Sequence, residues 1–208
     1  MEVIKVKDER LIIGRIPYAN LFPIFYILEH EVDCSLYTFV EGVPSLLNRM
    51  LREGEVDISP SSSLEYLRNP DRYRIISNHS ISSRGPVGSI LFFTTKPLEE
   101  LDGAAVLASS QSETSVALLK IVLGKFYGLS AKVDAVPNPE QAGEAFLLIG
   151  DDALRQQAIH LLSPITRYPY VYDLGEIWYR QTGLPFVFAL WIVRNDIPEK
   201  EKLVDKFT

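Results

Sequence analysis

Residues 11–59 decide the fold class: LIIGRIPYANLFPIFYILEHEVDCSLYTFVEGVPSLLNRMLREGEVDIS. The apolar run Leu11–Ile16 is followed by Pro17, which cannot continue a strand ladder, so the pattern predicts a buried strand that ends there. A helix over Leu21–Leu28, a strand over Leu36–Val40 and a second helix follow. This alternation of strand and helix indicates parallel strands joined by right-handed crossovers.

The alternation continues along the rest of the chain. Val56–Ser59 and Tyr73–Ile76 are the next predicted strands, and a loop of small residues over 80–88 leads into the apolar run Ser89–Phe93. We place a lobe boundary near Thr95 and expect a second α/β lobe beyond it. Its predicted elements are a strand over Ala104–Ala108, a helix over Ser115–Phe126, strands over Lys132–Val136 and Ala145–Ile149, a helix over Asp152–Ile159, a strand over Tyr170–Tyr172, a helical turn or two over Gly175–Gln181 and a strand over Phe186–Val193 that returns to the first lobe.

The chain length of 208 residues allows one large domain or two small lobes. The order of the elements favours two α/β lobes, one formed by residues 1–95 together with 190–208 and the other by residues 96–189. Hydrophobic residues make up 47% of the chain and charged residues 23%, which indicates a folded protein with a sizeable core.

Charge and cysteine content exclude several classes of protein. The net charge of −6 disfavours nucleic acid as a partner. The apolar runs over 89–95 and 186–193 are far shorter than the roughly 20 residues of a membrane span, so we expect no membrane partner. Cys34 is the only cysteine, which excludes an intramolecular disulfide and suits a reducing cytoplasm. The charged first ten residues do not resemble a secretory signal.

Common catalytic and nucleotide-binding motifs are absent. The sequence contains no GxGxxG, GxxxxGK[ST], GxSxG or HExxH. His30, His79 and His160 lack the spacing of metal ligands, so we expect no metal. We expect His30 and His160 at helix ends or on the surface, and His79 as a hydrogen-bonded structural residue.

Hydroxyl clusters lie where predicted strands end and helices begin, which is the ligand edge of open α/β sheets. Residues 109–115 (SSQSETS) form one cluster, Ser61–Ser63 form another, and the loop over 82–89 adds hydroxyls and two glycines. Helix-terminal amides and hydroxyls hold an anionic oxygen without a competing cation, so we expect a small carboxylate ligand. Ordinary N-capping is the alternative, but it explains one serine per helix and not three. Asp151 and Asp152 lie at the same edge, where helix capping also explains them.

Eight blocks of sequence form an ordered series that spans about residues 11–195: GRIPYAN (14–20), VEGVP (40–44) with Leu47-Asn48, SSLEY (62–66), ISSRGPVGS (81–89), SETS (112–115), LIGD (148–151), YDLG (172–175) and TGLPFVFA (182–189). In this order they resemble the chorismate dehydratases of the futalosine route to menaquinone. The resemblance implies a periplasmic-binding-protein-like, type II fold: two α/β lobes with mixed, mostly parallel sheets, two crossovers and a ligand cleft between the lobes.

The resemblance also implies an activity and a site. It implies a cytoplasmic lyase that converts chorismate, a small dicarboxylate, to 3-[(1-carboxyvinyl)oxy]benzoate plus water, without a metal or redox cofactor. The asparagine of the family's Ile-x-Tyr-x-Asn block maps onto Asn20 and the serine of its Val-x-Ser block onto Ser89, which are our catalytic candidates. The substrate-binding candidates are Tyr18, Ser62, Ser63, Ser83, Gly85, Ser112, Thr114, Ser115 and Asp151. Family members continue for some tens of residues at the C-terminus, so we expect a form extended there to be more stable.

This dehydration removes the C3 proton and the C4 hydroxyl of the ring and is driven by aromatisation. It therefore needs orientation, a base and help for the departing hydroxide. The sequence supplies no evident base, and an asparagine amide is far too weak, so we expect Asn20 to hold the substrate or to polarise the leaving hydroxyl. A carboxylate of the substrate itself is our hypothesis for the base.

Three alternatives share the fold. A small-carboxylate solute-binding protein would be exported, and no signal is seen. An effector domain of a transcription regulator would follow a helix-turn-helix, and only about ten residues precede the first strand. The naphthoate-forming enzyme of the same pathway has motifs that fit these blocks less well.

Overall fold

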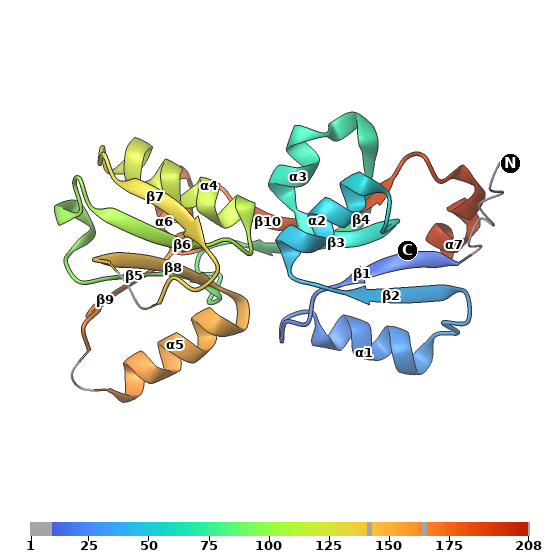
Figure 1. The fold of residues 1–208 in the computed structure, drawn as a ribbon, viewed down its shortest axis with the longest axis horizontal. Helices are drawn as coiled ribbons and strands as arrows, with labels where there is room; N and C mark the ends of the chain where they lie inside the picture. The colour runs from blue at the N-terminus through green and yellow to red at the C-terminus, as the bar shows by residue number, and fades with distance from the viewer. Residues whose placement is uncertain (1–9, 141–142, 164–165, 208) are drawn as a thin grey trace, which may run out of the picture.

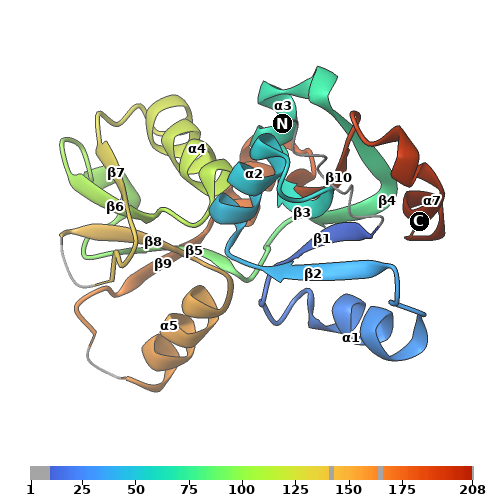
Figure 2. The same cartoon turned by 45° about the vertical axis from the view of Figure 1, so that its right-hand side comes forward.

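The computed structural model describes residues 10–140, 143–163 and 166–207. Two five-stranded sheets lie side by side, each with helices on both faces, and form two lobes (Figure 1 and Figure 2). The lobes of mixed α/β structure predicted from the sequence are therefore confirmed. In the described ranges, no helix combines the length and the apolar character needed to cross a membrane.

The first sheet has the order β2-β1-β3-β10-β4. Its strands are β1 (Leu11–Arg15), β2 (Tyr37–Glu41), β3 (Ile58–Ser62), β4 (Tyr73–Ser83) and β10 (Phe186–Arg194). β1 runs parallel to β2 and β3, whereas β10 runs antiparallel to β3 and β4. Its helices are α1 (Phe22–Glu31), α2 (Pro44–Glu53), α3 (Ser63–Arg68) and α7 (Glu201–Phe207).

The second sheet has the order β7-β6-β8-β5-β9. Its strands are β5 (Ile90–Thr94), β6 (Ala105–Ser109), β7 (Lys132–Val136), β8 (Ala145–Ile149) and β9 (Tyr170–Asp173). Its helices are α4 (Glu113–Ile121), which continues as a π-helical turn over Val122–Phe126, α5 (Gly150–Leu162) and α6 (Leu174–Thr182). Short 3-10 turns cover Pro70–Arg72, Leu98–Glu100 and Pro198–Lys200. β6 pairs in parallel with β7 and β8, and β5 pairs antiparallel with β8 and β9. In each sheet four strands therefore run in one direction and one runs against them, β10 in the first sheet and β5 in the second, which agrees with the mixed, mostly parallel sheets that we expected.

The central strands β5 and β8 of the second sheet are buried on both faces, which explains why β5 is a continuous apolar run. Ile90 and Phe92 pack into the core under α4 and α6, whereas Leu91 and Phe93 pack on the opposite face toward α5. A strand covered on both faces needs no polar residue at alternate positions. The sequence predicts such strands well because burial on both faces leaves this signature.

β4 is much longer than the strand predicted over 73–76. It runs to Ser83 and therefore includes the first residues of the predicted loop. Its pairing with β10 changes register between Leu190 and Ile192, and Asn78 takes a left-handed φ of 64° in that stretch. An irregular strand whose exposed face is polar lacks a clean period of two, so its sequence resembles a loop.

The predicted lobe limits and the sheet pairing differ at two places. Ile90–Thr94 belongs to the second sheet, although we placed it before the boundary near Thr95. Residues 186–189 belong to β10 in the first sheet, although we placed them in the second lobe. The chain passes between sheets just after Ser83 and just before Phe186, and the lobe limits themselves stay a prediction.

Candidate active site

A cavity of about 60 Å³ lies between the two lobes. Its walls come from the ends of β1, β3 and β8, and from the starts of α2, α4 and α5. The residues that line it are Ile16, Tyr18, Asn20, Pro44, Pro60, Ser61, Ser62, Ile81, Ser89, Ile90, Ser112, Ser115, Ile149, Gly150, Phe188 and Ala189. None of these described residues is a Lys, Arg, His, Asp or Glu. The cavity therefore offers a ligand hydroxyls, an amide, backbone groups and apolar surface.

The loop after β1 brings Tyr18 and Asn20 to the cavity. Pro17 ends the strand, and the chain turns over residues 19–21 before α1 begins. Asn20 is exposed, so its amide is accessible to a ligand in the cavity. The structure thus places Asn20 at the ligand edge, the position that the sequence predicts for it.

The end of β3 contributes two adjacent serines with different environments. Ser62 is the N-cap of α3: its Oγ accepts a hydrogen bond from the backbone N–H of Glu65 at 3.3 Å and another from Nδ2 of Asn48 at 3.0 Å. Ser61 is fully buried, and its Oγ has no hydrogen-bond partner among the described residues. A buried hydroxyl without a partner is unfavourable, so the Ser61 hydroxyl would gain a hydrogen bond from a ligand that reaches it. Our candidates included Ser62 but missed Ser61.

The opposite wall holds Ser112 and Ser115, which line the cavity as predicted positions of the second lobe. Ser112 is the N-cap of α4 and accepts a hydrogen bond from the backbone N–H of Ser115 at 3.3 Å, while the two hydroxyl oxygens lie 3.0 Å apart. Capping and cavity lining therefore coexist at these residues. Ser89 also lines the cavity, and its carbonyl accepts a hydrogen bond from the N–H of Gly150 at 2.8 Å.

Tyr18 lies where the two lobes meet. Its hydroxyl donates to Oε1 of Gln111, which lies between β6 and α4 of the other lobe. Burial, and then the nearby carboxylates of Asp152 and Asp151, raise the pKa of Tyr18 above its usual value of 10. A phenol with a raised pKa stays protonated at neutral pH, so Tyr18 acts as a donor and not as a base. Gly150 allows this approach, because a Cβ at that position would lie 2.9 Å from the Tyr18 ring.

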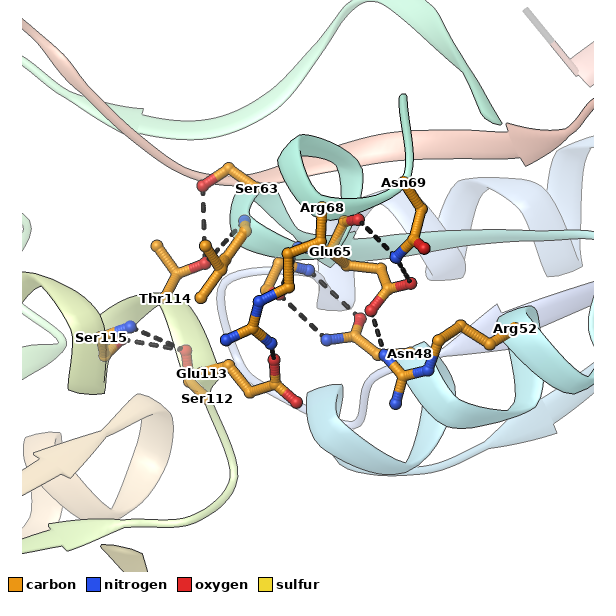
Figure 3. Close-up of polar contacts among 12 residues, drawn as sticks. Asn48, Arg52, Ser63, Glu65, Arg68, Asn69, Ser112, Glu113, Thr114 and Ser115 are labelled. Atoms are coloured by element: carbon orange, nitrogen blue, oxygen red, sulfur yellow. Dashed lines mark hydrogen bonds and ion pairs between the residues drawn. The ribbon is translucent and has the colours of Figure 1, made fainter. Parts of the chain in front are cut away.

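Three candidates join the lobes instead of lining the cavity. Thr114 accepts a hydrogen bond from the N–H of Leu64 at 3.1 Å, and its Oγ1 lies 3.5 Å from Oγ of Ser63, as Figure 3 shows. Ser63 donates to the carbonyl of Val187 at 2.7 Å. Asp151 accepts from the N–H of Ala19 at 3.1 Å. These polar groups have protein partners in this structure, and their part in holding substrate stays a prediction.

Ser83 and Gly85 also lie outside the cavity. Both pack against the start of α6, where a Cβ on Gly175 would lie 2.7 Å from Oγ of Ser83 and 2.7 Å from the carbonyl oxygen of Gly85. This loop of small residues packs closely on α6, and the substrate-binding role of Ser83 and Gly85 stays a prediction.

The histidines do not assemble a metal site. His30 and His160 lie in the last turns of α1 and α5, as predicted, and Nδ1 of His79 lies 2.8 Å from the carbonyl of Ser77. Within the part of the chain that the structure describes, no three His, Cys, Asp or Glu side chains gather in a way that could hold a metal ion.

Comparisons with known sequences match nearly the whole chain. A family described as menaquinone biosynthesis matches residues 11–208. A chorismate dehydratase from Thermus thermophilus is 34% identical over 206 residues, covering 93% of this chain and 73% of that protein. A chorismate dehydratase from Campylobacter jejuni is 27% identical over 183 residues, covering 86% of this chain and 66% of that protein.

Comparisons with solved structures identify the fold. A protein from Archaeoglobus fulgidus has a TM-score of 0.72 at 20% identity and covers 96% of this chain and 74% of its own. The periplasmic aliphatic sulphonate binding protein from Escherichia coli has a TM-score of 0.62 at 15% identity, covering 95% of this chain and 68% of its own. The two-lobed architecture is therefore that of the periplasmic binding proteins.

Proposed function

The chain belongs to the menaquinone biosynthesis family, and we propose that it dehydrates chorismate to 3-[(1-carboxyvinyl)oxy]benzoate in the cavity between its lobes, as a step of the futalosine route. The observation that carries this proposal is the 34% identity with a chorismate dehydratase over almost the entire chain. The family match over residues 11–208 contains every residue that lines the cavity.

The chemistry of the cavity supports substrate-assisted elimination. The reaction breaks the C3–H and C4–O bonds and forms the C3=C4 bond of the aromatic ring. No carboxylate, imidazole or amine lines the cavity among the described residues, and Tyr18 is held protonated. The proton at C3 then passes to a carboxylate of the substrate, and the departing hydroxide leaves as water after taking a proton. The protein supplies orientation, exclusion of solvent and hydrogen bonds.

Asn20 and Ser89 are the residues that we assign to the leaving hydroxyl. Both line the cavity and carry groups that donate a hydrogen bond without changing charge. A donor aimed at the C4 oxygen stabilises the negative charge that develops as the C4–O bond breaks. Neither residue is a base, which agrees with a proton acceptor on the substrate.

Hydroxyl groups on opposite walls of the cavity donate hydrogen bonds to the two carboxylates of chorismate. Ser61 and Ser62 end β3 on one side, and Ser112 and Ser115 begin α4 on the other. Hydroxyl and backbone donors bind carboxylates without a buried cation, which would otherwise lower the pKa of the substrate carboxylate that has to take the proton.

A carboxylate-binding receptor is the second candidate function, because the sulphonate binding protein shares the fold. The likeness to it rests on the fold at 15% identity, whereas both curated relatives above are dehydratases. The naphthoate-forming enzyme is the other alternative from the sequence. We place the reaction in the cytoplasm, as the single cysteine and the biosynthetic relatives favour, with a small molecule as the partner.

Incubation with chorismate tests the proposal. We expect loss of chorismate together with the appearance of an aromatic carboxylate with the mass of chorismate minus water. Ser89→Ala and Asn20→Ala should lower turnover. Tight binding of chorismate without any product would favour the receptor, and a naphthoate product from a later pathway intermediate would favour the related enzyme.

A further inference from the structure

A fully buried asparagine lies directly behind the cavity wall. Asn48 of α2 is 0% exposed and does not line the cavity itself. Its Nδ2 donates to Oγ of Ser62 at 3.0 Å, and its Oδ1 accepts from the backbone N–H of Ser62 at 3.3 Å. Figure 3 shows Asn48 pointing from α2 toward the start of α3. One side chain therefore holds both the main chain and the hydroxyl of Ser62.

The hydrogen bonds of Ser62 leave its hydroxyl a single role. A serine hydroxyl has two acceptor lone pairs and one hydrogen to donate. One lone pair accepts from Asn48 and the other from the N–H of Glu65. Both acceptor positions are thus filled by the protein, and the hydrogen alone is left for the cavity that Ser62 lines.

The second of these bonds is itself held in place by a buried network. The carboxylate of Glu65 is fully buried and accepts a hydrogen bond from the hydroxyl of Tyr73 at 2.8 Å. It also accepts from Nδ2 of Asn69 at 3.1 Å and pairs with Arg52, as Figure 3 shows. These contacts anchor α3 from the side away from the cavity. The N–H of Glu65 cannot move away from Ser62 without breaking them.

We propose that Asn48 is a positioning residue that makes the Ser62 hydroxyl an obligate donor to a carboxylate oxygen of the substrate. This inference rests on the proposed function and gives a structural reason why the site prefers a carboxylate to a hydroxyl group. A carboxylate oxygen only accepts, so it matches an obligate donor. A ligand hydroxyl that needs an acceptor finds none at Ser62.

The test reverses the direction in which the Ser62 hydroxyl donates its hydrogen, without removing the hydroxyl. In Asn48→Asp, the carboxylate accepts the Ser62 hydrogen and turns it away from the cavity. The KM and the Kd for chorismate should then rise about 10- to 150-fold, the range for a lost hydrogen bond to a charged group, with kcat changing much less. Ser62→Ala should give a similar rise. Asn78→Asp is the matched control, because it adds the same charge on the exposed part of β4.

A variant without added charge covers the case in which Asn48→Asp does not fold. Asn48→Ala frees one acceptor position of the Ser62 hydroxyl while the N–H of Glu65 still occupies the other, so the hydrogen is shared between two staggered positions and KM should rise about twofold. In a Ser62→Ala background, Asn48→Ala should have no further effect on KM. A purely structural asparagine would lower the melting temperature in both backgrounds and would multiply its effect on KM with that of Ser62→Ala.

The outcomes separate this inference from the proposed function. A wild-type chain that binds chorismate without turnover, with affinity lost in Asn48→Asp, would overturn the dehydratase and keep the role of Asn48. Turnover by the wild type, with KM unchanged in Asn48→Asp and Asn48→Ala, would overturn the role of Asn48 and keep the dehydratase. A wild-type chain that neither binds nor converts chorismate would overturn both.

Discussion

Replacing Ser61 with alanine should raise the stability of the protein and weaken its binding of chorismate. The Ser61 Oγ is buried and has no partner among the described residues, and such a group costs about 1–3 kcal/mol. Its removal eliminates that cost but leaves a void the size of one atom, so we expect the free energy of unfolding to rise by about 1 kcal/mol. For a chain of this size the melting temperature should rise by about 2–4 °C.

The same substitution removes a donor that we assign to a substrate carboxylate. A hydrogen bond to a charged group contributes about 1.5–3 kcal/mol, so the Kd for chorismate should rise about 10- to 150-fold. Thermal melting without ligand and calorimetric titration with chorismate measure the two effects on one preparation. An improvement in stability together with a loss of affinity is expected where a polar group is kept for its ligand.

Ser59→Ala provides the control on the same strand. Ser59 is as buried as Ser61, but its Oγ donates to the carbonyl of Pro60 at 3.1 Å and it does not line the cavity. We expect this variant to lose about 1 kcal/mol of stability and to bind chorismate normally. If Ser61→Ala is destabilised like Ser59→Ala and keeps its affinity within twofold, Ser61 has a structural partner and is no part of the site.

Further predictions concern the other walls of the cavity. Asn20→Ala should lower kcat/KM about 10- to 150-fold. A fall in kcat with KM unchanged would show that Asn20 acts on the departing hydroxyl. Wild-type kinetics would show that Asn20 is not part of the site. Gly150→Ala should lower the free energy of unfolding by about 1–3 kcal/mol and remove most of the activity, because φ is +57° and the new Cβ would lie 2.9 Å from the Tyr18 ring. Gly124→Ala is the control and should leave stability unchanged, because the space around Gly124 is open. Equal melting temperatures for the two variants would contradict this reasoning. Tyr18 has a raised pKa, so the unfolded chain loses this proton first as the pH passes 10, and stability should fall above that pH and not below it. Urea titrations of Tyr18→Phe should show a smaller loss above pH 10 than the wild type, and an equal loss would mean that Tyr18 is not perturbed.

Sequence reasoning recovered the elements whose burial leaves a local pattern. β5 is apolar on both faces, and α2 is framed by Pro44 at its start and Gly54 in a left-handed conformation at its end. Such signals lie within a few neighbouring residues. Ser112 and Ser115 were found on the same basis, because hydroxyls between a strand and a helix mark both a cap and a ligand edge.

The run of serines at Ser61–Ser63 shows where a local sequence pattern stops predicting what each residue does. Three identical residues stand in a row, and their partners decide what each one does. Ser62 is held by Asn48, 14 residues earlier, and Ser63 donates to Val187, 124 residues later. Ser61 is the one left without a protein partner. Those distances along the chain carry no periodic signal, so a sequence alone cannot separate the three.

The position of β10 between β3 and β4 has a consequence for how the protein is made. On a ribosome, β3 and β4 emerge early, but the strand that joins them begins only at Phe186, after the whole segment of the second sheet has been synthesised. The second sheet is one continuous stretch of chain from β5 to β9, so it can fold first. Until β10 arrives, β3 and β4 expose unpaired edges that other nascent chains can pair with. We therefore expect the slow and aggregation-sensitive step of folding to be the insertion of this late strand into the middle of the first sheet, and not the assembly of either lobe's helices.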